Sequence, residues 1–187
     1  HYPLRRQRQM CIRDSNYVML DLGQPLHMFD AAKLTEPIVV RRAKQGEVLT
    51  TLDDKARTLH PEDLVVADST GGHGARPVAL AGVMGGSDTE VVSSTVDVVI
   101  EAAHFDPTTQ ARTARRHKLV SEAGKRGERG VDPALVEVAA QRAAQLLVEY
   151  GGGTLGSTRT HARAGQEVAT EISLPLDYAE RVVGVAY

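Results

Sequence analysis

Short apolar runs rich in valine, separated by turn residues, dominate the first hundred residues and constrain the fold most strongly. Runs of this length with turn residues at both ends are typical of β-strands, because β-branched side chains suit the extended backbone. The predicted strands are Tyr17 to Leu22, Ile38 to Arg42, Leu64 to Ala67, Val78 to Val83 and Val96 to Glu101. Two further runs, 47–52 and 56–59, flank Asp53 and Asp54, which predicts a hairpin with an aspartate-rich turn.

Two helices are predicted downstream by one shared signal, an aspartate that can cap a helix followed by a proline suited to its first position. The signals are Asp106-Pro107 and Asp132-Pro133. The second helix is expected to run to Tyr150, where three glycines stop it. Because strands come first and helices later, the chain is predicted to be an α+β protein with a largely antiparallel sheet and packed helices.

The composition excludes several classes of protein. Of the 187 residues, 42% are hydrophobic and 25% charged, which is typical of a globular domain. No apolar run approaches the roughly 18 to 20 residues that a membrane span needs, so no membrane contact is expected. The single cysteine, Cys11, cannot form an internal disulfide, which favours a reducing compartment and a cytoplasmic location.

Positive charge is concentrated in one stretch of the chain. Residues 112–129 hold seven basic and two acidic side chains, although the net charge of the whole chain is -2. Such a stretch is either a contact surface for a polyanion or the solvated face of a helix. The sequence leaves both interpretations open.

The first fifteen residues, HYPLRRQRQMCIRDS, have neither a helical nor an alternating period and no signal-peptide core. The segment MCIRDS resembles the translated adapter read-through of a sequence assembly. We therefore expect residues 1–15 to be extraneous or disordered, and the remainder to be a truncated gene product.

Three features are candidates for chemistry, and each has a structural alternative. His27 follows a proline turn, where a histidine is more often a packing or capping residue than a catalyst. Residues 77–86 form a strand that runs into a glycine turn, which indicates either tight backbone packing or close approach of a ligand to main-chain N–H groups. Glu101 ends a valine-rich strand and is either a salt-bridge partner or a specificity group. The histidines lack metal-ligand spacing and no Gly-x-Ser-x-Gly elbow occurs, so neither a metal site nor a serine nucleophile is predicted.

Six segments follow one another in a recognisable order: NYVMLDLGQPLHMFD, IVVRRAKQGEVLTTLD, HPEDLVVAD, ALAGVMGGSDTEV, FDPTTQARTARRHKLVSEA and ERGVDPALVEVAAQRAAQLL. Together, from about Asn16 to Thr154, they resemble the central editing module of the bacterial phenylalanyl-tRNA synthetase beta subunit. The tail from Thr170 is similar to the opening of the next module of that subunit. The resemblance implies an editing domain over residues 16–165, and a linker with a truncated following domain over residues 166–187.

The resemblance implies hydrolysis of mischarged tyrosyl-tRNA(Phe), in support of phenylalanine ligation by the alpha subunit of an α2β2 heterotetramer. Editing would need no cofactor and no metal, whereas the complete synthetase uses ATP and magnesium. By the same resemblance, His27 is the catalytic histidine of the pocket and Glu101 reads the tyrosine hydroxyl. Ala81 and Gly82 match the small residues that form the floor of the substrate site.

The basic stretch gains a candidate role from the same resemblance, because tRNA is a polyanion. Arg115, Arg116 and Lys118 are candidate tRNA-binding residues. Two alternatives stay open, a non-catalytic subunit-assembly or RNA-binding module of the same enzyme, and an inert fragment.

This chain departs from the family pattern at two places. The family has a threonine where this chain has Ser15, inside the segment expected to be extraneous. Gly124 and Gly127 replace a serine and an aromatic residue, so weak local order is expected between Ala123 and Gly130.

Overall fold

The computed structural model describes residues 4–165 and 171–186. The chain divides into a compact unit that ends at Leu155 and a second unit that begins at Gly156. The described part of the second unit contains a short, exposed helix, α5 (Tyr178–Val183). All candidate site residues lie in the first unit. The predicted domain boundaries, 16–165 and 166–187, stay predictions.

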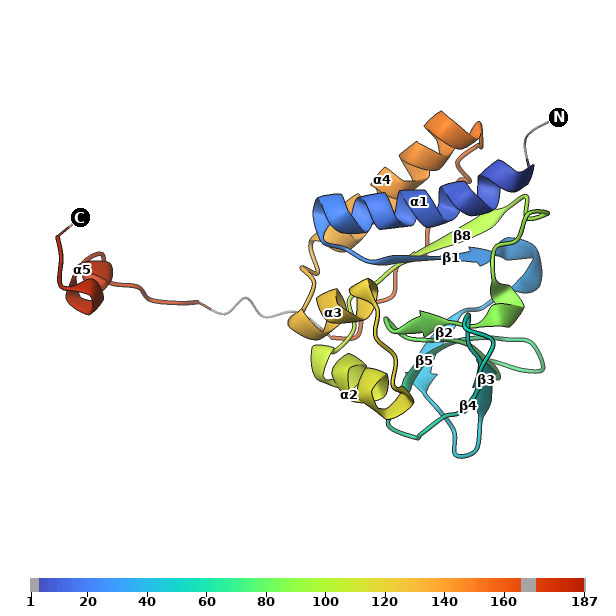
Figure 1. The fold of residues 1–187 in the computed structure, drawn as a ribbon, viewed down its shortest axis with the longest axis horizontal. Helices are drawn as coiled ribbons and strands as arrows, with labels where there is room; N and C mark the ends of the chain where they lie inside the picture. The colour runs from blue at the N-terminus through green and yellow to red at the C-terminus, as the bar shows by residue number, and fades with distance from the viewer. Residues whose placement is uncertain (1–3, 166–170, 187) are drawn as a thin grey trace. The chain divides into compact units, whose positions relative to one another are not determined.

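A two-stranded antiparallel ribbon with two helices on it forms one layer of the compact unit (Figure 1). Strand β1 (Leu26–Asp30) pairs with β8 (Val98–Ala102), although about seventy residues separate them. Helices α1 (Leu4–Leu22) and α4 (Leu135–Gly151) lie against each other and on this ribbon. Buried apolar side chains of α1, β1 and α4 form one core between the helices and the ribbon.

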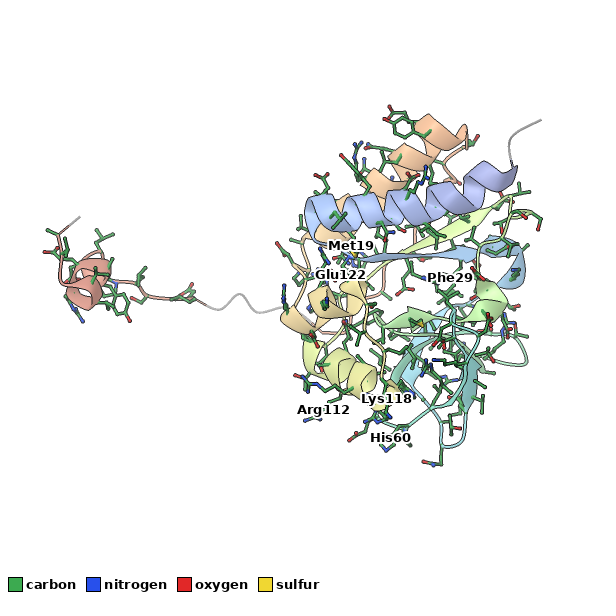
Figure 2. All side chains as sticks on the ribbon, in the orientation of Figure 1. Met19, Phe29, His60, Arg112, Lys118 and Glu122 are labelled. Carbon is green, nitrogen blue, oxygen red and sulfur yellow. The ribbon has the colours of Figure 1, made fainter. Side chains whose placement is uncertain are left out.

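A four-stranded antiparallel sheet forms the second layer, with the strand order β2-β5-β6-β7. Its strands are β2 (Val39–Arg42), β5 (Leu64–Asp68), β6 (Arg76–Leu80) and β7 (Met84–Gly85). The predicted hairpin is confirmed, because β3 (Val48–Thr50) pairs with β4 (Ala56–Thr58). Phe29 of β1 packs against Val66 and Val78 of the sheet, and Figure 2 shows its side chain on the sheet side of β1. The predicted α+β fold with antiparallel sheets is confirmed.

Helices α2 (Pro107–His117) and α3 (Glu122–Arg129) follow β8 and lie together at one end of the two layers (Figure 1). The cap predicted for the first of them is present, since the Asp106 carboxylate accepts a hydrogen bond from the Thr109 N–H at 2.7 Å. Ser121 caps α3 in the same way, with its hydroxyl accepting from the Gly124 N–H at 2.9 Å. The weak local order expected between Ala123 and Gly130 is therefore not seen, because a capped helix occupies this segment.

The strand predicted near the N-terminus was wrong. Tyr17 to Leu22, predicted as a strand, is the last part of α1, and residues from Leu4 onward belong to the same helix. Cys11 is 4% exposed and Val18 is fully buried in the α1–α4 core, seven residues apart as on one face of a helix. The buried face of the helix begins within residues 1–15, and the expectation that these residues are extraneous stays a prediction.

The last helix of the compact unit begins later than predicted. The Asp132 carboxylate accepts from the Ala134 N–H at 2.9 Å and forms a turn, and α4 begins at Leu135. The predicted end is confirmed, because α4 ends at Gly151 and Gly152 adopts a left-handed conformation with φ of 66°.

Candidate functional site

A pocket opens between α2, α3 and the strands of both layers. Its cavity volume is about 90 Å³, and it is open to solvent. Its lining includes His27, Gly82, Gly85, Glu101, Gln110 and Gly127. Three of the sequence-predicted site residues therefore meet here, from β1, from the turn after β6 and from β8.

His27 lies on β1, and its ring is held between an aromatic neighbour and a glycine. The ring meets Phe29 edge-on, with the centroids 4.4 Å apart and an angle of 81° between the planes. A Cβ atom at Gly85 would overlap the imidazole, so this position requires a glycine. Burial lowers the pKa of His27 to about 4, so the ring is neutral at pH 7. Its Nε2 atom is buried without a hydrogen-bond partner.

Glu101 lies directly opposite His27 in the antiparallel pairing of β8 with β1. Residues that face each other across two strands project their side chains to the same side of the ribbon. Burial raises the pKa of the Glu101 carboxyl to about 7. The site thus holds a neutral imidazole beside a carboxyl group that changes its charge near neutral pH.

Ala81 and Gly82 follow β6, but only Gly82 lines the pocket, whereas Ala81 lies in the core. Gly82 lines the pocket with φ of 67°, a left-handed conformation that favours glycine. A Cβ there would lie 2.7 Å from Cδ and Nε2 of Gln110. Ala81 is 3% exposed and packs in the core with Phe29 and Val66, and it is not among the described residues that line the pocket.

Gln110, which sequence reasoning missed, is a buried polar residue of the pocket wall. It lies in the first turn of α2 and is only 4% exposed. Its Oε1 atom is buried without a hydrogen-bond partner. A Cβ at Gly127 of α3 would overlap this oxygen, so the carboxamide occupies space that the two glycines, Gly82 and Gly127, leave free.

Ser15, which the resemblance aligns with a threonine, lies in α1. Its hydroxyl donates a hydrogen bond to the Ile12 carbonyl at 3.1 Å. Ser15 is not among the described residues that line the pocket.

The three predicted tRNA-binding residues have different surroundings at the end of α2. The Arg116 guanidinium donates to the Asp63 carboxylate, and its second branch reaches Glu62 Oε2 at 2.9 Å. Arg115 and Lys118 are exposed, and Figure 2 shows Lys118 at the end of α2. The structure thus separates one internally paired arginine from two exposed cations.

Two structural findings concern metals and membranes. Within residues 4–165 and 171–186 no group of three or more His, Cys, Asp or Glu side chains could hold a metal ion. In the same part of the chain, no helix has both the length and the apolar character that crossing a bilayer requires.

The chain is similar to known proteins over the part that forms this pocket. The family described as the B3/4 domain matches residues 11–152, which include α1 from Cys11 onward and every element that lines the pocket. The phenylalanine–tRNA ligase beta subunit of Nocardia farcinica is 54% identical over 173 residues, which cover 92% of this chain and 20% of that protein. The beta subunit of Streptomyces avermitilis is 51% identical over 185 residues, which cover 97% of this chain and 22% of that protein.

The chain thus spans about a fifth of the length of the curated relatives it matches. Among solved structures, an N-terminal fragment of the phenylalanyl-tRNA synthetase beta-subunit from Pyrococcus horikoshii is similar with a TM-score of 0.41 and 16% identity. This likeness covers 65% of this chain and 40% of that one.

Proposed function

Because the chain belongs to the B3/4 domain family, we propose that its pocket hydrolyses the ester of tyrosyl-tRNA(Phe), as a proofreading module of a phenylalanine–tRNA ligase beta subunit. The observation that carries this proposal is the pairing of His27 with Glu101 across β1 and β8, inside one pocket with Gly82. A pocket that binds phenylalanine by apolar contact rejects an added hydroxyl only about a hundredfold. A second site that hydrogen-bonds the hydroxyl discriminates far better, because the wrong ligand leaves its buried polar groups unpaired.

In the proposed arrangement, Glu101 accepts a hydrogen bond from the phenolic hydroxyl of the tyrosyl group. A carboxylate is the stronger acceptor for this bond, and with a pKa of about 7 a large fraction of Glu101 is ionised at neutral pH. The aromatic ring lies beside Gly82, next to the Gln110 carboxamide that packs on this glycine. Ala81 supports this floor from the core behind it.

His27 would orient the attacking water at the ester. A neutral imidazole has one nitrogen that can accept a proton or a hydrogen bond, and burial keeps His27 neutral at pH 7. The water oxygen adds to the ester carbonyl carbon, and the bond from that carbon to the ribose oxygen breaks. A proton of the water passes to the ribose oxygen, and tyrosine and uncharged tRNA leave.

Partners and location follow from the same proposal. The module would belong to an α2β2 heterotetramer with the alpha subunit, bind tRNA(Phe) and lie in the cytoplasm. ATP and magnesium would serve ligation elsewhere in the complete enzyme. The described residues offer no cluster for the metal, and the sequence has no phosphate-binding loop between Asn16 and Thr170 that fits a nucleotide.

The test compares deacylation of tyrosyl-tRNA and phenylalanyl-tRNA by wild type, Glu101→Ala and His27→Ala. Removing a charge-assisted hydrogen bond costs about 1.5 to 3 kcal/mol, so Glu101→Ala should slow the tyrosyl reaction about 10- to 150-fold. The phenylalanyl reaction, which lacks this contact, should change little. His27→Ala should slow both reactions.

Melting curves of the same variants separate function from stability. Equal loss on both substrates by Glu101→Ala, together with a lower melting temperature, would make Glu101 a structural residue and contradict the proposal. No tyrosyl-tRNA hydrolysis by wild type, with tRNA still bound, would instead favour the non-catalytic RNA-binding alternative.

A further inference from the structure

Gln110 is a buried amide that the packing of the protein leaves unsatisfied. The residue is 4% exposed, and its Oε1 atom has no hydrogen-bond partner. A buried polar atom without a partner costs about 1 to 3 kcal/mol. Both glycines that the amide packs on line the pocket, so the carboxamide is a polar group of the pocket wall that a ligand can contact.

The position of this amide is fixed by two missing side chains. A Cβ at Gly82 would lie 2.7 Å from the carboxamide nitrogen, and a Cβ at Gly127 would overlap the carboxamide oxygen. Gln110 therefore borders the floor of the pocket on one side and α3 on the other. Because neither glycine has a side chain, the polar carboxamide forms the pocket wall here.

Tyrosyl and phenylalanyl groups differ only by a hydroxyl, which donates one hydrogen bond and can accept others. A carboxamide supplies both an acceptor and donors, and a carboxylate supplies acceptors. The hydroxyl has one proton, so when it donates to the Glu101 carboxylate it accepts a hydrogen bond from Nε2 of Gln110, the amide atom that faces Gly82. We propose that Gln110 is a second specificity residue of the pocket, which hydrogen-bonds the ring hydroxyl of a bound tyrosyl group together with Glu101. This inference rests on the proposed binding of a tyrosyl group against Gly82.

The ring hydroxyl fits Gln110 better than the ammonium group of the ligand does. Gln110 contacts the space at Gly82, which is the proposed place of the ring. The ester and the ammonium would lie at His27. The ring of His27 packs on Gly85, whereas Gln110 packs on Gly82. A contact with the ammonium would affect tyrosyl and phenylalanyl ligands equally, whereas a contact with the hydroxyl affects only the former.

The experiment measures binding of tyrosinamide and phenylalaninamide by calorimetry or NMR titration of the whole chain. These amides carry the aminoacyl group and are not hydrolysed as the ester is. Gln110→Met keeps the length and volume of the side chain but removes its hydrogen bonds. The expected result is a preference of wild type for tyrosinamide that falls about 2- to 12-fold in Gln110→Met, as the loss of one neutral hydrogen bond predicts. Gln145→Met, at an exposed position of α4, is the matched control and should keep the wild-type preference.

A second variant moves the amide without changing it. Gly127→Ala places a methyl group where Gln110 Oε1 lies, so it should reduce the preference for tyrosinamide as Gln110→Met does. Gly124→Ala makes the same substitution in the same helix, where the added Cβ lies 3.1 Å from Ser121 Oγ and does not meet the pocket wall. Both alanines raise helix propensity equally, so a difference between the variants reports the displaced amide.

An unchanged preference in Gln110→Met and Gly127→Ala would overturn the inference, as would a wild-type chain that binds both amides equally. An equal loss for both amides would assign Gln110 to the ammonium and likewise overturn it. Deacylation of tyrosyl-tRNA by wild type is measured separately. Hydrolysis with an unchanged preference leaves the proposed function standing without this role for Gln110. A lost preference without hydrolysis keeps Gln110 as a recognition residue and contradicts hydrolysis alone.

Discussion

Asp63 and Glu101 are carboxyl groups of one compact unit, and their surroundings are opposite. Asp63 is fully buried, yet it accepts from Thr113 Oγ1 at 3.1 Å, lies 2.7 Å from His117 Nε2 and pairs with the Arg116 guanidinium. Glu101 lines the pocket, where burial of its carboxyl alone shifts the pKa. Removing a partner from the Asp63 cluster would leave a buried charge uncompensated, whereas the pKa of Glu101 is shifted by burial without a charged partner.

The pKa values of the two groups move in opposite directions. Burial alone would raise the pKa of Asp63, but the hydrogen bonds from His117 and the His60 N–H, with the charge of Arg116, outweigh it and hold the pKa below its usual value. Burial raises the pKa of Glu101 to about 7 with no such compensation. Asp63 therefore stabilises the folded state at neutral pH, whereas Glu101 destabilises it there.

The largest effect on stability is expected from Asp63→Asn. The substitution removes the charge that Arg116 and His117 face, and breaking such a buried cluster costs about 3 to 5 kcal/mol of unfolding free energy. Because the folded-state pKa of Asp63 is depressed, its contribution is fully present at pH 7 and is lost as the pH falls through that pKa. Urea unfolding at a series of pH values should show the largest difference from wild type at pH 7 and a smaller one toward pH 3.

The control for this substitution is Glu122→Gln in α3. Glu122 forms exposed ion pairs with Lys125 and Arg126 at 2.8 and 2.9 Å. Its loss should cost much less than the loss of the Asp63 cluster, because exposed ion pairs contribute little to stability. Equal effects of the two substitutions would contradict the structural role given to Asp63.

Glu101→Gln should have the opposite sign. A carboxyl whose pKa rises from 4.5 to about 7 on folding binds more protons in the folded state, so stability decreases as the pH rises between these values. An amide does not ionise, and the variant should be more stable than wild type at pH 8 by up to about 3 kcal/mol. At pH 4 the two should differ little, which a pair of melting curves at each pH would show. A less stable variant at pH 8 would reveal a structural partner of the Glu101 carboxylate.

The difference between these two groups was only partly predictable from the sequence. The sequence indicates Glu101 as a candidate, because an ionisable residue at the end of a valine-rich strand needs a partner or a function. Its place opposite His27 is not predictable from the sequence, because it depends on pairing of two strands about seventy residues apart. The family resemblance supplied its proposed role. The sequence predicts no role for Asp63, because its hydrogen-bond partners lie in α2 and only the folded chain brings them together.

The helices and strands, too, were predictable only where their signals are local in the sequence. Periodic strands and the Asp106 cap were found because each signal is local. Helix α3 was missed because Gly124 and Gly127 lower its intrinsic propensity, while the Ser121 cap and the approach of Gln110 to Gly127 compensate in the fold. Gln110 itself reads as an ordinary polar residue of a helix, and its burial becomes visible only through that approach.

The smallest expected effect is on tRNA binding by the basic end of α2. This end of the helix also holds one charge that is paired within the protein and two that are exposed to solvent. Arg116 is paired with Asp63, so its substitution should lower stability, whereas Arg115 and Lys118 are exposed. If the proposed module binds tRNA with these two residues, the double substitution to glutamine should weaken binding and reduce the slope of log K against log salt by about 1.5, as the loss of two phosphate contacts predicts.

Substituting the exposed Lys44 and Lys55 removes the same net charge from another surface and should leave most of the slope unchanged. The measurement is tRNA(Phe) binding at several salt concentrations, with melting curves to confirm folding. Equal slopes for both double variants would show that Arg115 and Lys118 act only through net charge, and the basic stretch would then be a solvated helix face.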